Sequence, residues 1–314
     1  MLEHTLIFGP QQHLVGTITQ PDRSAGGAPP VMALLTNAGV IPRVGPHRMN
    51  VKLARRFAAL GIPTLRFDLS GLGDSKRPVS TLSAAAQFVA DTRAAMDLAA
   101  QRHGSQRFFM VGFCSGADIA HLTALEDPRL QAAVLFDAYV YPTRKAKLLG
   151  LLHRVRRHGP HAAAYKLARY LLRERLARRG AAPAEAAVAE GPVIFGRTRM
   201  PPRDEFGQRI RALVERGMKL HFVYSGGEPD WYNYEAQFKD MFDPYGFVDR
   251  VDYTYLAQSD HTITQPHAQE ALTELVVRWL QERVIGTAAV PAGMPPGQTL
   301  PTSSLAVPAT RAAA

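Results

Sequence analysis

The regular alternation of short apolar runs with amphipathic segments limits most strongly what this chain can fold into. Runs rich in β-branched and aromatic residues occur at 31–36, 63–68, 107–112, 132–137, 219–225 and 250–257. Segments with apolar residues at three- and four-residue spacing occur at 47–60, 82–103, 116–127 and 267–284. Strands that are apolar throughout and separated by helices are typical of a mostly parallel sheet covered on both faces. We therefore predict an α/β fold, entered through an antiparallel hairpin within residues 1–30.

The alternation stops between Asp137 and Lys219, where no strand pattern occurs. Two basic amphipathic helix candidates, KAKLLGLLHRVRRHG and AAAYKLARYLLRERLARRG, fill much of this stretch. An insertion between strands explains it best, so we predict a core of residues 1–137 and 216–285 with a helical cap at 138–215. Residues 286–314 are rich in Pro, Gly, Ala, Ser and Thr without periodicity, which predicts a disordered C-terminal tail.

The net charge of +10 is concentrated in the predicted cap. Between Pro142 and Gly180 there are twelve Lys or Arg residues and one acid, Glu174, while the remaining 25 basic and 26 acidic residues nearly cancel. Such a segment is either a solvated face or a surface for an anionic partner, such as coenzyme A, an acyl-carrier protein or an anionic lipid surface. Nucleic acid is a weaker expectation, because the only aromatic residues there are Tyr165 and Tyr170.

Compartment and cofactor content follow from what the sequence lacks. The N-terminal MLEHTLIFGPQQH has neither a basic nor an apolar signal region, and no run of 18 apolar residues occurs. We therefore expect a cytoplasmic protein without a transmembrane segment. A single cysteine excludes an intramolecular disulfide and a multi-cysteine metal site, and we expect neither a metal nor a cofactor.

The hexapeptide GFCSGA at residues 112–117 stands between a predicted strand and a predicted helix. This layout matches the G-x-nucleophile-x-G turn, in which a strained backbone presents the nucleophile and its neighbours two positions away must be small. Gly112 and Gly116 satisfy that condition for Cys114, whereas Ser115 as the nucleophile would put Phe113 into the crowded position. We predict that Cys114 is the nucleophile and that the Ser115 amide is an oxyanion donor. The alternative is a buried structural cysteine in a glycine-rich turn.

A histidine and an acid should complete the site later in the chain. His261 stands in a loop between the last strand and the last helix, whereas His267 at the helix start is expected to be a cap or surface residue. For the acid, GGEPD offers Asp230 as the first choice and Glu228 as the alternative, both after the strand at 219–225. Asp137, one strand earlier, is the third candidate.

The second oxyanion donor is expected in the loop NAGVIPRVGPHR, which follows the strand at 31–36. A glycine-containing turn there can aim a backbone N–H at the site. Val40 is the first choice and Gly39 the second. The alternative is that Asn37-Ala38-Gly39 forms only a turn.

Across nearly all of residues 1–285 the sequence resembles the α/β-hydrolase superfamily. LRFDLSGLGDS at 65–75 is similar to the DxxGxGxS segment after the fourth strand of that superfamily, and GFCSGA, GGEPD and SDH follow in the family's order. The resemblance implies a mostly parallel central sheet with flanking helices and covalent acyl chemistry.

The cysteine in place of the usual serine resembles dienelactone hydrolases and polyhydroxyalkanoate synthases, both of which use a Cys-His-Asp triad. Bacterial hydrolases with a CSGA elbow, some of them associated with exosortase systems or biosynthetic clusters, are also similar. The chain is shorter than common polyhydroxyalkanoate synthases and has a more basic cap than dienelactone hydrolases, so neither substrate is carried over.

These features predict an enzyme that cleaves or transfers an acyl group of an ester or thioester through Cys114, with His261 and Asp230 as partners. One alternative is an acyltransferase or thioesterase that acts on coenzyme A or carrier-protein substrates. The other is a non-catalytic binding protein, which would have lost the nucleophile, histidine or acid.

Overall fold

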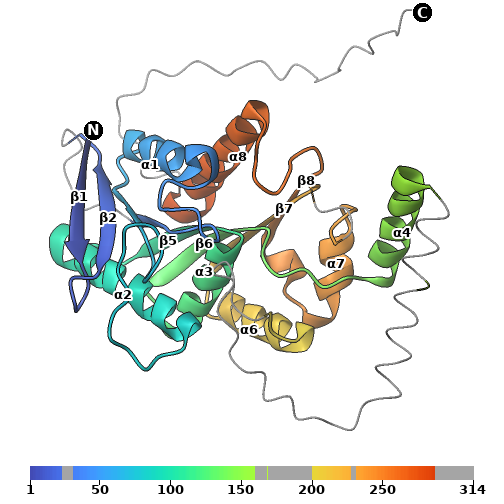
Figure 1. The fold of residues 1–314 in the computed structure, drawn as a ribbon, viewed down its shortest axis with the longest axis horizontal. Helices are drawn as coiled ribbons and strands as arrows, with labels where there is room; N and C mark the ends of the chain where they lie inside the picture. Colours follow the sequence, from blue (N-terminus) through green and yellow to red (C-terminus); the bar gives the residue numbers. More distant parts are fainter. Residues whose placement is uncertain (23–30, 160–167, 169–199, 228–230, 287–314) are drawn as a thin grey trace, which may run out of the picture.

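The computed structural model describes residues 1–22, 31–159, 168, 200–227 and 231–286. Within them the chain forms an eight-stranded sheet in the order β1-β2-β4-β3-β5-β6-β7-β8 (Figure 1). The strands are β1 (Leu2–Phe8), β2 (Leu14–Gln20), β3 (Met32–Leu35), β4 (Thr64–Phe67), β5 (Phe108–Phe113), β6 (Leu130–Phe136), β7 (Lys219–Ser225) and β8 (Asp252–Leu256). Only β2 runs antiparallel to its neighbours β1 and β4, and all other pairs are parallel. The predicted strands and the N-terminal hairpin are confirmed.

Burial on both faces explains why the central strands are apolar throughout. Every residue of β3, β4 and β5 is buried, as expected for parallel strands with helices on each side. One core cluster packs between the sheet and α2 (Ala84–His103), α3 (Ser115–Glu126) and α6 (Arg203–Glu215). The other packs between the sheet and α1 (Met49–Ala59), α8 (Pro266–Trp279) and the following π-helical turn η5 (Leu280–Ile285). Figure 1 shows these two helical layers above and below the sheet.

The described part of the insertion after β6 contains two helices with different environments. α6 buries Phe206, Ile210 and Leu213 in the core beside α3, so this part of the predicted cap is a covering helix of the sheet. α4 (Arg144–His158) stands away from the sheet at the right of Figure 1. The second basic helix candidate and the C-terminal tail lie outside the described residues, apart from residues 168 and 286.

The first turn of α4 attaches the helix to the segment that precedes α7 (Gln237–Phe242). The Thr143 hydroxyl caps the helix by accepting from the Ala146 amide, and it lies 2.7 Å from the hydroxyl of Tyr234. Asn233 Nδ2 donates to the Ala146 carbonyl over 2.9 Å. Short 3₁₀ turns η1 (Pro46–Arg48), η3 (Asp243–Tyr245) and η4 (Val248–Arg250) complete the described elements.

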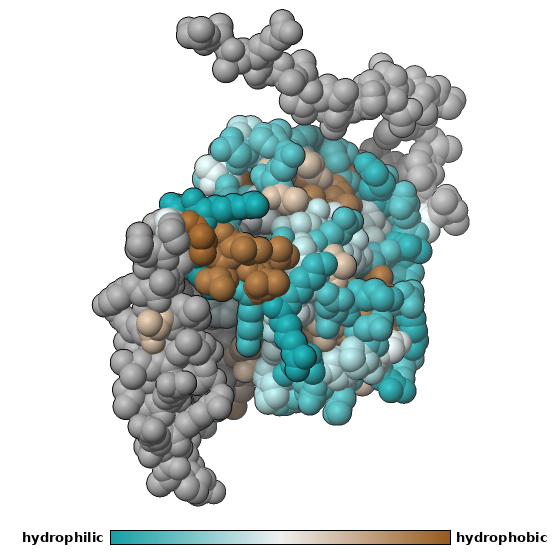
Figure 2. Space-filling view, turned by 90° about the vertical axis from the view of Figure 1, so that its right-hand side faces the viewer, coloured by the Kyte–Doolittle hydropathy of each residue, from teal (hydrophilic) through white to brown (hydrophobic). Residues whose placement is uncertain are grey.

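The exposed surface of α4 is apolar as well as basic. The side chains of Leu148 and Leu152 are 58% and 48% exposed, although leucine side chains are usually buried. Figure 2 looks onto the side of the molecule that carries α4 and shows a hydrophobic patch on it. Over the described residues, no helix has the length and apolar content needed to cross a membrane.

We expect Phe206→Ala to lower the free energy of unfolding by about 3–5 kcal/mol, because the ring is fully buried against Tyr139 and Phe242. Leu148→Ala on the exposed face of α4 should change it by less than about 0.5 kcal/mol. Urea unfolding of both variants measures the difference. Equal effects would contradict the assignment of α6 to the core.

Candidate functional site

Cys114 occupies the turn between β5 and α3 in a backbone conformation that is rare for any residue other than glycine. Its φ is 53° and its ψ is −117°. The Cys114 amide donates to the Phe136 carbonyl over 2.9 Å, and the Cys114 carbonyl accepts from the Ala117 amide at 2.9 Å. These bonds fix the strained turn to β6 on one side and to α3 on the other.

The two glycines of GFCSGA are required by close backbone contacts. A Cβ on Gly112 would lie 2.3 Å from the Gly116 carbonyl oxygen, and a Cβ on Gly116 would lie 2.8 Å from the Asn37 carbonyl oxygen. No real Cβ tolerates these distances, so larger residues would push β5, α3 and the loop after β3 apart. The small-residue condition used to choose Cys114 over Ser115 therefore has a direct steric basis.

Ser115, the next residue, is buried and only 3% exposed. Its hydroxyl accepts a hydrogen bond from the Gly39 amide at 2.8 Å, whereas Cys114 is only partly buried. The Ser115 side chain therefore holds the loop after β3 against the start of α3. This contact also occupies the Gly39 amide, the second choice for the oxyanion donor.

A buried carboxylate also fixes the loop after β3. Asp68, which begins the DLSGLGDS stretch, accepts from the amide of Arg43 at 2.6 Å and from Asn37 Nδ2 at 3.1 Å, and it pairs with the Arg43 guanidinium. Gly73 passes so near that a Cβ there would lie 2.4 Å from the Asp68 carboxylate. Val40 stands at the exposed tip of this braced loop, and among the described residues no group accepts from its amide.

His261 pairs with Asp137 at the carboxyl ends of the strands. The imidazole Nδ1 lies 2.7 Å from Oδ2 of Asp137, and a carboxylate can only accept, so Nδ1 donates. The Ser225 amide and hydroxyl also donate to Asp137, each over 2.7 Å. Asp137 itself has a positive φ of 48°, and its amide donates to the Val223 carbonyl. Three donors therefore fix the carboxylate that orients the imidazole.

The hydrogen bond to Asp137, followed by one to Cys114, outweighs burial and raises the pKa of His261 to about 10. The imidazole is therefore protonated at neutral pH and lies beside the thiol. The site thus brings a cation next to the candidate nucleophile.

The acid that contacts His261 is the third candidate from the sequence. Asp230 and Glu228, the first and second choices, lie outside the described residues. Asp137 was detectable as the residue that ends the run AAVLFD, but the sequence does not show which strand end the histidine loop approaches. His267, at the start of α8, is exposed.

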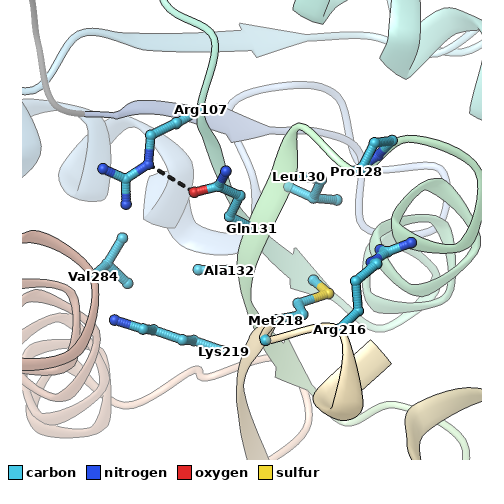
Figure 3. Close-up of a pocket in the computed structure, with 10 residues that line it drawn as sticks. Arg107, Pro128, Leu130, Gln131, Ala132, Arg216, Met218, Lys219 and Val284 are labelled. Atoms are coloured by element: carbon cyan, nitrogen blue, oxygen red, sulfur yellow. Dashed lines mark hydrogen bonds between the residues drawn. The ribbon is translucent and has the colours of Figure 1, made fainter. Parts of the chain in front are cut away.

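The described residues contain no group of three or more His, Cys, Asp or Glu side chains that could hold a metal ion. The opposite edge of the sheet has a hollow of about 350 Å³ at the amino ends of β5, β6 and β7 (Figure 3). Its cations Arg107, Arg216 and Lys219 each donate to a protein acceptor: the Gln131 side chain, the Ala124 carbonyl and the Arg283 carbonyl, respectively. This hollow is thus remote from Cys114 and Asp137, which follow the carboxyl ends of β5 and β6.

Solved structures of proteins named as hydrolases or esterases align with most of the chain. An α/β serine hydrolase homologue from Coxiella burnetii aligns with a TM-score of 0.52 and 16% identity, over 89% of this chain and 97% of that one. The chain has the α/β-hydrolase fold. An esterase from Pyrococcus furiosus aligns with a TM-score of 0.54 and 12% identity, over 89% of this chain and 90% of that one.

An esterase domain from Rhodothermus marinus has the same α/β-hydrolase fold, with a TM-score of 0.53 and 14% identity over 89% of this chain and 98% of that domain. A protein-family profile described as "Serine aminopeptidase, S33" matches residues 47–194, just under half of the chain. A comparison of the sequence with curated proteins gave no match.

We expect Gly112→Ala to destabilise the protein by more than about 3 kcal/mol, because its Cβ would collide with backbone that cannot move aside. Gly104→Ala is the matched control, since Gly104 has a φ of 68° but open space around its Cβ position. That variant should cost about 1–2 kcal/mol, the penalty of a left-handed backbone alone. Thermal and urea unfolding compare the two, and a Gly112 variant as stable as the control would contradict the steric explanation.

The raised pKa of His261 predicts how alkylation of Cys114 depends on pH. The protonated imidazole persists from pH 6 to 8 and loses its proton only as the pH rises through about 10. Iodoacetamide should therefore alkylate the wild type at pH 6–7 at least about ten times faster than His261→Gln, with the difference closing at high pH. His267→Gln, an exposed control, should behave as the wild type. Equal rates in the His261 variant and the wild type would contradict the pairing.

Proposed function

We propose that this protein is an acyl hydrolase that cleaves an ester or thioester through a covalent thioester on Cys114. The observation that carries the proposal is a cysteine on a strained strand-to-helix turn, beside a histidine that Asp137 orients. A cysteine kept only for packing needs neither the positive φ nor the partner. Proteins that have the same fold and are named as hydrolases or esterases add support to a hydrolase.

Acylation begins with the thiolate of Cys114 attacking the carbonyl carbon. The new C–S bond pushes the carbonyl electron pair onto oxygen, where the amides of Ser115 and Val40 are the proposed donors. As the tetrahedral intermediate collapses, the imidazolium of His261 gives its Nε2 proton to the departing alkoxide or thiolate. Asp137 holds Nδ1, so the ring keeps the orientation that this transfer requires.

Deacylation reverses the role of the imidazole. His261, now neutral, takes a proton from a water molecule whose oxygen attacks the thioester carbonyl. Collapse of the second intermediate breaks the C–S bond, releases the carboxylic acid and restores the thiolate and imidazolium. The protonated histidine at rest thus suits a cysteine better than a serine, because a serine hydroxyl would need a neutral base at the first step.

A second candidate is acyl transfer, and the cysteine itself favours it. A thioester acyl-enzyme reacts readily with amines, thiols and alcohols, so an acceptor other than water can take the acyl group. The candidates are separated by incubating the enzyme and a thioester with and without such acceptors. Product ratios that do not respond to the acceptor would leave hydrolysis alone.

We expect intact-mass spectrometry to find one acyl adduct after exposure to a short acyl thioester, and Cys114→Ala to abolish it. Ser115→Ala should still form the adduct, because its hydroxyl is buried and bonded to Gly39. An adduct that persists in Cys114→Ala would overturn the proposed nucleophile.

The acid is tested on the same reaction. Asp137→Asn should lower the acylation rate at least about a hundredfold, because the amide no longer supports the protonated imidazole. Asp230→Asn is the matched control and should remain within about twofold of the wild type. The reverse result would assign the role to Asp230.

A further inference from the structure

A hollow of about 300 Å³ lies between α4 and the ends of β7 and β8. The α4 side contributes Leu149, Leu152, His153 and Arg156, and the body contributes Gly226 and Tyr255 among others. The hollow is therefore a joint feature of the basic helix and the edge of the sheet that carries the candidate site.

The inner edge of this hollow adjoins the residues that support the histidine and the acid. Gly226 directly follows Ser225, which donates two hydrogen bonds to Asp137. A Cβ on Gly227 would lie 2.6 Å from the amide nitrogen of His261. Gly226 in the hollow is thus the neighbour in sequence of a residue that binds Asp137 and of a residue that packs against His261.

The walls combine apolar surface with positive charge. Leu149, Leu152 and Tyr255 supply apolar surface, while Arg156 and His153 supply the cation and a second hydrogen-bonding group. No carboxylate lines the hollow among the described residues, and α4 has six Lys or Arg residues and no acid. A ligand that fits these walls has an apolar chain and a negative group.

The helix that carries these side chains is held in place at its first turn. Besides the contacts of Thr143 and Asn233, the Lys145 ammonium lies 4.5 Å from the centre of the Tyr234 ring. The guanidinium of Arg156 is therefore presented from an anchored helix three turns further on, since a helix turns once every 3.6 residues.

We propose that this hollow is a subsite for an anionic group of the acyl substrate, with Arg156 as its binding residue. The inference rests on the proposed function, because it takes the Cys114 thioester as the reaction that the subsite serves. It names the substrate class as esters or thioesters with an apolar chain and a carboxylate or phosphate. The negative group can belong to the acyl chain or to the leaving group, and the test separates these two sources.

The test compares three thioesters that share a six-carbon acyl chain. Hexanoyl-N-acetylcysteamine is neutral, its adipoyl counterpart adds a terminal carboxylate, and hexanoyl coenzyme A adds phosphates in the leaving group. We expect the wild type to prefer one anionic substrate over the neutral one by at least about tenfold in kcat/KM, since a hydrogen bond to a charged group contributes more than a neutral one. The substrate that gains identifies the source of the charge.

Arg156→Gln should reduce this preference to about one, while Arg157→Gln should retain it. Arg157 is the matched control because it is exposed on the same helix, carries the same charge and does not line the hollow. A preference that survives in Arg156→Gln, or disappears equally in Arg157→Gln, would overturn the subsite.

Failure of the subsite and failure of the proposed function have different signatures. If Cys114 forms adducts with the neutral and anionic thioesters at equal rates, the function stands and the subsite is overturned. If no ester acylates Cys114, the proposed function fails, and calorimetric binding of octanoate to Cys114→Ala decides the subsite alone. Octanoate affinity should then fall at least about fivefold on adding Arg156→Gln, and an unchanged affinity or the absence of binding would overturn the subsite.

Discussion

The positive φ of Cys114 is the constraint on which the rest of the site depends. A strained backbone persists only where its surroundings leave no alternative, and here Gly112 and Gly116 bring β5, α3 and the loop after β3 into direct backbone contact. Ser115 then bonds that loop through the Gly39 amide. The elbow therefore organises two neighbouring segments in addition to presenting one thiol.

The electrostatics of the site follow from partial burial. His261 is not deep enough for desolvation to dominate, so its bonds to Asp137 and Cys114 raise its pKa to about 10. His121 shows the opposite case, because burial between Tyr139 and Phe206 lowers its pKa to about 3. An imidazole is thus a cation at the carboxyl ends of the strands, in His261, and a neutral packing group within α3, in His121.

Much of the fold could be predicted from the sequence, because buried parallel strands leave continuous apolar runs and the elbow leaves its two glycines. The choice of His261 among the histidines could also be made from the sequence, since this residue follows the last strand. The acidic partner of His261 was harder to predict. Spacing after a strand favours Asp230 over Asp137, whereas the contact depends on how the histidine loop crosses the ends of β6 and β7, which spacing does not encode. The place of α6 could not be predicted for a related reason. Its amphipathic pattern shows that one face is buried, but not whether that face packs on the sheet or on the cap.

The amide of Cys114 donates to the carbonyl of Phe136, the residue immediately before Asp137. The sulfur and the carboxylate are therefore mounted on one hydrogen-bonded strand pair and move together when β5 and β6 shift. His261 comes from a different segment, the loop between β8 and α8. The sulfur and the carboxylate thus share one local framework, while the imidazole reaches them from a separate part of the chain.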